Sequence, residues 1–392
     1  MFKYIFIFIL SLYFVNGQTY KDVLKQIGSN NKEIKAYKEY LNSVNIESRT
    51  NSLPLNPKVE YSYLSGSGIA TGNKQELIIS QPFDFPTVYF LKSDISSLQG
   101  SANQFHLKEF EKSILKNTQN LLIEFIYLQK KVDELKKRYE LAGNMLKTVQ
   151  AKFDKGDIGV LELNKTKSNL SIAKSKLNMA KIELNSIQSE LENINGGQQI
   201  QLTFSDYWTY DFSSNYDSLF IKLKEADFYN KLLEEEKKLY DKKLSLARAG
   251  WLPNFDVGYR QETETDLAYK GVRLQMSLPL FENTNKVPKA ESELNLTDLK
   301  IQSYNSKFYI EKKRIFDKSL QLKSSLDEQK GLVDYNQLDL NKKSYDLGHI
   351  SLTQFYIDNT MYYEIIDSIL ETELEYQETL SELLIELNVS DL

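Results

Sequence analysis

The stretch Phe153-Asp154-Lys155-Gly156-Asp157-Ile158 interrupts a long apolar repeat, which then resumes. Before it, apolar residues recur at alternating spacings of four and three from Leu121 to Phe153, and the same spacing continues afterwards from Leu163 to Ile194. A repeat of this kind keeps one apolar stripe facing a partner helix and is typical of coiled coils. Glycine permits the left-handed backbone with which a helix can end before the chain reverses. We therefore predict an antiparallel helical hairpin with its tip at Gly156.

A second tip of the same kind lies 192 residues further on, in Tyr345-Asp346-Leu347-Gly348-His349-Ile350. It is followed by a comparable seam from Tyr362 to Leu387, which is broken only at Glu373. Upstream, two prolines have counterparts at similar offsets: Pro57 pairs with Pro253, and Pro82 pairs with Pro279. Three markers in the same order predict an internal duplication.

The chain begins with a stretch that has the features of a secretory signal. Lys3 supplies the positive start, residues 4–15 form an apolar core, and Val15-Asn16-Gly17 offers a small-residue cleavage site. The alternative interpretation is a buried N-terminal strand. We expect a signal peptide at 1–17, a first repeat at 18–197, an irregular linker at 198–217 and a second repeat at 218–392.

Two segments alternate apolar and polar residues with a period of two, which indicates strands. The first strand hairpin is predicted at 57–83, with its loop at 65–73. The second is predicted at 253–281, with its loop at 262–269. Outer-membrane barrel strands show this alternation over about ten residues, and so does a half-buried strand of a soluble sheet. The signal peptide, together with the long helices joined to each strand, favours the barrel.

Helices are expected at 20–50, 86–153 and 218–248. The second would extend roughly 100 Å if unbroken, which suits a tunnel wall or a stalk better than a globular core. Four strands per chain cannot close a barrel, and open sheet edges in lipid leave backbone groups unpaired. The chain must therefore oligomerise to share one barrel: two copies would supply eight strands and three would supply twelve.

The composition excludes several classes of function. The net charge of -5 argues against a nucleic-acid partner. Cysteine is absent and the two histidines, His106 and His349, lie far apart in the sequence, so no metal-ligand spacing is present. We find neither a phosphate-binding glycine loop nor a nucleophile elbow. We expect no catalytic, cofactor or metal site, and no enzyme activity.

The order of signal, helix, strand hairpin, long helix, glycine tip and heptad return, occurring twice, resembles the TolC-type outer membrane factors of Gram-negative bacteria. The strongest local matches are 151–163, 274–281 and 343–355. The resemblance implies a mainly α-helical homotrimer with a twelve-stranded outer-membrane β-barrel above a periplasmic tunnel of helices. It also implies an efflux or secretion channel that works with a periplasmic adaptor and an inner-membrane transporter.

The family's helical tips contact the adaptor and form the closed periplasmic aperture. By position, the docking tips here are Gly156, Asp157, Ile158, Gly348, His349 and Ile350. The family often has an acidic residue nine positions after the second tip glycine; this sequence has Ile357 there and an aspartate one position later. The candidate aperture residues are Glu162, Gln354 and Asp358.

The alternative function is a periplasmic coiled-coil stalk or adaptor without a membrane span. An adaptor has one hairpin flanked by small β domains, whereas this chain has two hairpins alternating with two amphipathic strand pairs. That difference favours the channel.

Overall fold

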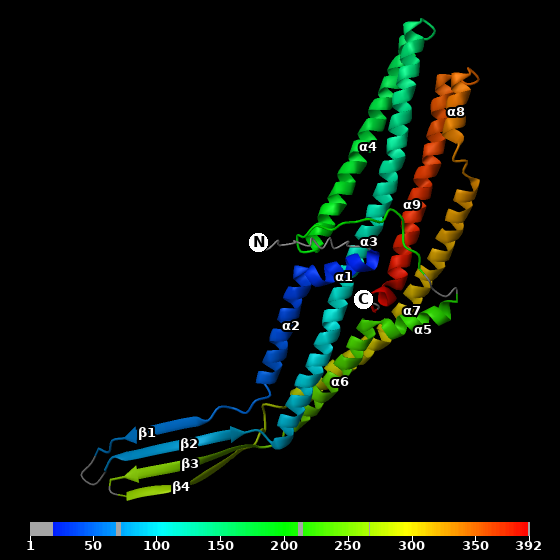
Figure 1. Ribbon diagram of the computed structural model, residues 1–392. Helices are drawn as coiled ribbons and strands as arrows, with labels where there is room; N and C mark the ends of the chain where they lie inside the picture. Colours follow the sequence, from blue (N-terminus) through cyan, green and yellow to red (C-terminus); the bar gives the residue numbers. More distant parts are fainter. Residues whose placement is uncertain (1–18, 68–71, 211–214, 266, 391–392) are drawn as a thin grey trace, which may run out of the picture. The chain divides into compact units, whose positions relative to one another are not determined.

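The computed structural model describes residues 19–67, 72–210, 215–265 and 267–390, so the predicted signal peptide lies outside the described part of the chain (Figure 1). In the described residues the helices are α1 Tyr20–Asn30, α2 Lys32–Thr50, α3 Pro86–Asp154, α4 Val160–Ile194, α5 Tyr216–Ala226, α6 Phe228–Ala249, α7 Lys286–Leu332, α8 Gln337–Asp346 and α9 Leu352–Ser390. The strands are β1 Lys58–Leu64, β2 Lys74–Phe83, β3 Asn254–Glu264 and β4 Leu267–Ser277. The described chain is thus mainly helical, with one four-stranded sheet.

The chain divides into two compact units. The helical unit takes its described residues from Met1–Lys32, Glu111–Ala226 and Glu311–Leu392, and the strand unit takes its residues from Glu33–Phe110 and Asp227–Ile310.

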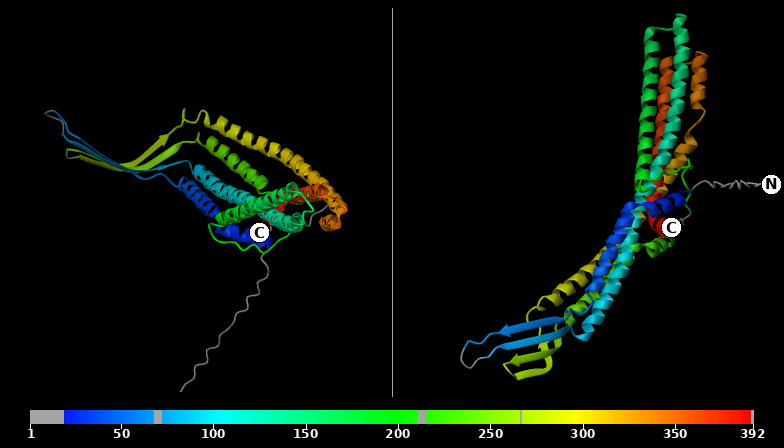
Figure 2. Two further views of the ribbon diagram at one scale, coloured as in Figure 1. Left: turned by 90° about the horizontal axis from the view of Figure 1, so that it is seen from above. Right: turned by 60° about the vertical axis from the view of Figure 1, so that its left-hand side comes forward.

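In the helical unit, the α3–α4 hairpin runs beside the hairpin of α8 and α9 (Figure 2). The predicted seam packs as a coiled coil: Leu135 of α3 is buried against Leu177 and Ala180 of α4. A second cluster joins Leu326 of α7 to Tyr362, Ile366 and Ile369 of α9. Burial of such side chains stabilises a helix pair by about 1.5–3 kcal/mol each relative to exposure.

The segment 198–210 forms neither helix nor strand. Its apolar side chains nevertheless pack on a buried cluster that includes Leu24 of α1, Leu122 of α3 and Leu191 of α4. Trp208 also stacks on Tyr20, with ring centroids 4.2 Å apart. The segment is therefore fixed to three helices by burial, although it has no regular hydrogen-bonding pattern.

Two helices that we predicted to be continuous are broken. The prediction of one helix over 20–50 is wrong, because the chain leaves the helical conformation at Asn31, whose side chain donates to Ile194 O at 2.9 Å. The helix expected at 218–248 is interrupted at Asp227. This fully buried aspartate caps α6 by accepting from Tyr229 N at 3.0 Å, and it also accepts from Tyr304 Oη at 2.7 Å. Both breaks depend on partners distant in sequence.

The helical segment that leads to the tip is continuous in the first hairpin and interrupted in the second. α3 continues without interruption to the first tip, whereas α7 ends at Leu332 and α8 begins at Gln337. The sequence does not indicate this interruption, because apolar residues such as Val333 and Leu338 continue across it and pack on the α9 cluster.

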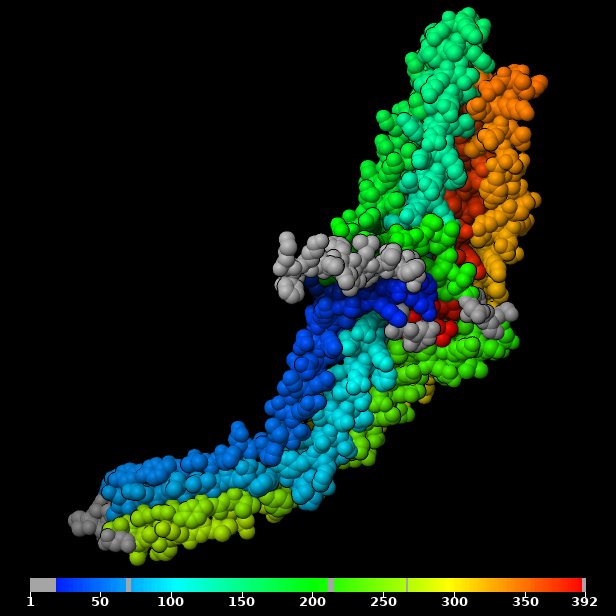
Figure 3. Space-filling view, in the orientation of Figure 1, coloured from blue at the N-terminus to red at the C-terminus, as the bar shows by residue number. Residues whose placement is uncertain are grey.

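In the strand unit the sheet order is β1-β2-β3-β4, and every neighbouring pair is antiparallel. One row across the register joins Val59, Ile79, Tyr259 and Val272. Figure 3 shows the four strands as one continuous surface. Because β1 and β4 each pair with only one neighbour within the sheet, both edges are open.

The second strand hairpin is tighter than predicted. The prediction of a loop at 262–269 is wrong, because strand pairing continues to Glu264↔Leu267. The strand expected to reach 281 ends at Ser277, two residues before Pro279, which lacks the N–H that a ladder requires.

Candidate functional site

The first hairpin tip is built by a glycine in the left-handed conformation. Gly156 has φ +80°, and its N–H donates to Phe153 O at 2.9 Å while Asp157 N donates to Lys152 O at 2.9 Å. These two bonds form a Schellman motif, which satisfies the last carbonyl groups of α3. The Glu162 carboxylate then caps the start of α4 by accepting a hydrogen bond from Gly159 N at 3.2 Å.

The second tip repeats this arrangement. Gly348 has φ +76°, and it donates to Tyr345 O at 3.0 Å while His349 N donates to Ser344 O at 2.9 Å. Here Ser351 precedes the first residue of α9, Leu352, and its hydroxyl accepts from Gln354 N at 3.1 Å. The two tips therefore share one hydrogen-bonding geometry.

The two tips lie together on one apolar cluster. Its buried members come from α3, α4, α8 and α9, and Ile158 and Ile350 pack against it from the two tips. The buried members are Met145, Val149, Leu163, Tyr345, Leu352 and Phe355. Lys152 of the first hairpin also lies 4.3 Å from the ring centroid of Tyr345 of the second. The tips are therefore parts of one surface.

The predicted docking residues fall into two groups on this surface. Gly156, Asp157, Gly348 and His349 are exposed, whereas Ile158 and Ile350 are half-buried in the cluster. A Cβ added at either glycine would meet no atom within 4 Å. The exposed group is available for contacts, and the two isoleucines hold the tips in place.

The candidate aperture residues are mostly engaged locally. Glu162 caps its own helix, and Gln354 Nε2 donates to Asp358 Oδ1 at 2.7 Å. Between them, Ile357 is 49% exposed.

Sequence reasoning missed the ionic contacts that join the two hairpins. Arg138 of α3 forms two hydrogen bonds to the Asp367 carboxylate of α9, at 2.7 and 3.0 Å. Its guanidinium lies 4.4 Å from the ring centroid of Tyr363. Burial raises the pKa of Tyr363 to about 12, although the Arg138 charge opposes the rise. No local sequence signal distinguishes Arg138 from the lysines around it.

Glu373, which interrupts the second seam, accepts from Lys130 at 2.9 Å and from Lys330 at 2.7 Å. Its side chain is only 13% exposed. Burial alone would raise the pKa of this carboxyl, but the hydrogen bonds from Lys330 and Lys130 outweigh burial and lower it. The polar residue in an apolar seam was the signal that marked this position.

In the strand unit, the two faces of the sheet differ in chemistry. One face presents large exposed apolar side chains, among them Val59, Val272 and Leu274, which are 68%, 79% and 77% exposed. On the opposite face, Arg260 Nε lies 2.6 Å from Glu76 Oε1, and Lys74 Nζ lies 2.6 Å from Glu262 Oε1. An apolar face of this extent on a folded protein marks a surface that contacts lipid or another protein.

Comparisons with solved structures identify the fold. The chain is similar to the Campylobacter jejuni CmeC outer membrane channel, with 15% identity and a TM-score of 0.70 over 94% of this chain and 85% of that one. It is similar to a membrane protein from Pseudomonas aeruginosa, with 11% identity and a TM-score of 0.77 over 93% and 89%. CusC, described as forming a transmembrane channel, has 13% identity and a TM-score of 0.72 over 94% and 91%.

The fold is therefore that of the outer membrane channels, and the resemblance to the outer membrane factors is confirmed at the level of the fold. No protein-family model matches the sequence, and no curated protein sequence matches it.

Within the described ranges, no helix is both long enough and apolar enough to cross a membrane. Across the same residues, no three histidine, aspartate or glutamate side chains gather as a metal-binding group.

Proposed function

We propose that the chain is the outer membrane channel of an export system in a Gram-negative bacterium. The single observation that carries this proposal is the four-stranded sheet with open edges, one exposed apolar face and one charged face. The likeness of the fold to outer membrane channels supports the same function.

Three copies sharing their sheets would form a closed barrel of twelve strands. Closure would pair β1 of one copy with β4 of the next, so that no backbone group is left unpaired in hydrocarbon. The apolar face would then contact lipid, and the face with Arg260, Glu76 and Glu262 would line a wet interior.

The α3–α4 and α8–α9 hairpins would form the periplasmic tunnel, with the docking tips meeting a periplasmic adaptor of an inner-membrane transporter. The matched geometry of the tips supports a common docking role, because Asp157 and His349 occupy equivalent exposed positions after Gly156 and Gly348. The same equivalence supports an origin by internal duplication. Such a channel would catalyse no reaction.

The alternative function, a periplasmic coiled-coil stalk or adaptor, is disfavoured by the exposed apolar face of the sheet. In water, exposing that face would cost about 25 cal/mol for each Å² of apolar area.

Cell fractionation distinguishes the two functions. After expression in a Gram-negative host, the channel is expected in detergent-extracted outer membrane as an oligomer that dissociates on heating. Recovery of a monomer from the periplasmic fraction without detergent would support the stalk instead.

A further inference from the structure

The helical unit contains a partly open cavity of about 320 Å³ between α3, α4 and α9. Its lining combines apolar and polar side chains, including Ala142, Met145 and Phe355 beside Arg138, Asn359 and Tyr356. A volume near 300 Å³ is at the lower end of small-molecule sites.

Two buried polar atoms at this cavity make no well-formed hydrogen bond within the described residues: Arg138 Nε, and Tyr356 Oη, which lies near Thr166 and Asn169. Arg138 is only 7% exposed, and its two terminal nitrogens are already bound to Asp367. Its Nε–H can only donate. A buried donor without an acceptor is unfavourable, so a partner at this position would be favoured.

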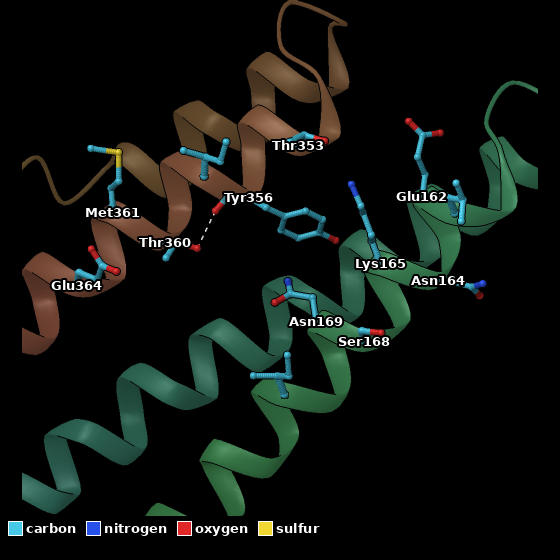
Figure 4. Close-up of a pocket in the computed structure, with 13 residues that line it drawn as sticks. Glu162, Asn164, Lys165, Ser168, Asn169, Thr353, Tyr356, Thr360, Met361 and Glu364 are labelled. Carbon is cyan, nitrogen blue, oxygen red and sulfur yellow. Dashed lines mark hydrogen bonds between the residues drawn. The ribbon is translucent and has the colours of Figure 1, made fainter.

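The Tyr356 hydroxyl is a second donor. Burial raises the pKa of Tyr356, and its contacts with Thr166 and Asn169 oppose this rise only in part. The phenol therefore keeps its proton at neutral pH. Figure 4 shows the Tyr356 ring reaching from α9 toward α4, on the side of Asn169 and Ser168.

The cavity continues into a wider groove of about 800 Å³ between α4 and α9. The two share the lining residues Asn169, Ile172, Tyr356, Thr360 and Glu364. The groove has four exposed apolar side chains along its walls: Leu161 is 75% exposed, Ile172 56%, Ile357 49% and Met361 58%. Charged side chains of both signs, Glu162, Lys165 and Glu364, line it as well. A groove with both apolar and charged side chains thus leads inward to two unsatisfied donors.

We infer that the α4–α9 groove and its inner cavity form a binding site for a small amphipathic molecule that carries a hydrogen-bond-accepting head group, such as a carboxylate. The head group accepts from Arg138 Nε and Tyr356 Oη, and the apolar body lies against Ile172, Ile357 and Met361. A ligand with only donors would leave both protein donors unpaired. The inference does not depend on the chain being a channel.

The test is equilibrium dialysis of the full chain in amphipol with two probes of similar shape, naphthalene-2-carboxylate and 2-naphthylmethylammonium. We expect one carboxylate probe to bind per chain, about tenfold or more tightly than the ammonium probe. Tyr356→Phe removes only the hydroxyl and should weaken carboxylate binding by about three- to tenfold. Met361→Trp, at an exposed wall residue, should block the groove and abolish binding.

The matched control is Met179→Trp, because Met179 lies on α4, is 60% exposed and lines neither the groove nor the cavity. It should bind the carboxylate probe as the unchanged chain does. Equal affinity for the two probes, or an unchanged affinity in Tyr356→Phe, would overturn the inference. A density map of the probe-soaked chain that shows only water bound to both donors would also overturn the inference.

Discussion

Arg138 and Asp367 join the two helical hairpins through a two-pronged ion pair, in which Nη2 lies 2.7 Å from Oδ1 and Nη1 lies 3.0 Å from Oδ2. The arginine is 7% exposed and the aspartate 45%. Asp367→Ala would leave a buried guanidinium without its counter-ion, which costs 3–5 kcal/mol in a fully buried pair. Because Asp367 is partly exposed, we expect a loss of about 1–3 kcal/mol in the free energy of unfolding, measured by denaturant titration of the helical circular dichroism signal.

The control for this prediction is Asp317→Ala. It removes a partner of Lys313 in an exposed pair within one helix, and it should cost about 0.5 kcal/mol or less. If both variants lost the same free energy of unfolding, the Arg138–Asp367 pair would not hold the two hairpins together.

Glu373 is expected to make the stability of the helical unit depend on pH. Its pKa in the folded chain lies below the ordinary value of 4.5, so the folded state holds this proton less readily than the unfolded state. The resulting stability is present above pH 4.5 and is lost as the pH falls through the lowered pKa.

Glu373→Gln removes the charge that Lys130 and Lys330 share, and it should cost about 1–2 kcal/mol at neutral pH. In this variant the unfolding temperature should also fall less steeply as the pH is lowered below 4.5. A variant whose acid-side decline matches that of the unchanged chain would contradict the account of this residue.

Substitutions at the two tip glycines can distinguish the need for a left-handed backbone from the need for a docking surface. Gly156→Arg and Gly348→Arg would each place a side chain in the left-handed region at a cost of about 1–2 kcal/mol, and the added charge would project into open space. We expect assembly to survive and export to fail. Export is measured as sensitivity to a toxic compound that the native system removes.

Gly156→Asn is the matched control, because asparagine tolerates the left-handed conformation and adds no charge. It should retain export. Normal export in both arginine variants would refute the docking role of the tips.

The two faces of the sheet should respond oppositely to a charge. Leu274→Lys places a cation on the exposed apolar face, where lysine near the middle of a bilayer costs about 2–4 kcal/mol. Gln275→Lys puts the same charge on the opposite face, directly across from Asp256 in the register. Outer-membrane fractionation should show loss of the first variant and retention of the second. Loss of both, or of neither, would argue against a lipid-facing surface.

The elements that could be predicted from sequence are those fixed by local chemistry. The seam around Gly156 required only a heptad spacing and one glycine, and the strands around Val59 and Val272 required only alternation. The breaks at Asn31 and Asp227 could not be predicted, because their partners, Ile194 and Tyr304, lie far away in sequence. The same holds for contacts between hairpins: Arg138 meets Asp367 across 229 residues of chain.

The central claim is that identical chains combine their open sheets into one barrel in the outer membrane. A structure of the assembly extracted from that membrane by detergent tests it most directly. We predict three copies with β1 of each paired to β4 of the next, giving twelve strands with Leu274 facing detergent and Arg260 facing the interior. A single copy whose apolar sheet face is covered by another protein, or by its own helices, would contradict the claim.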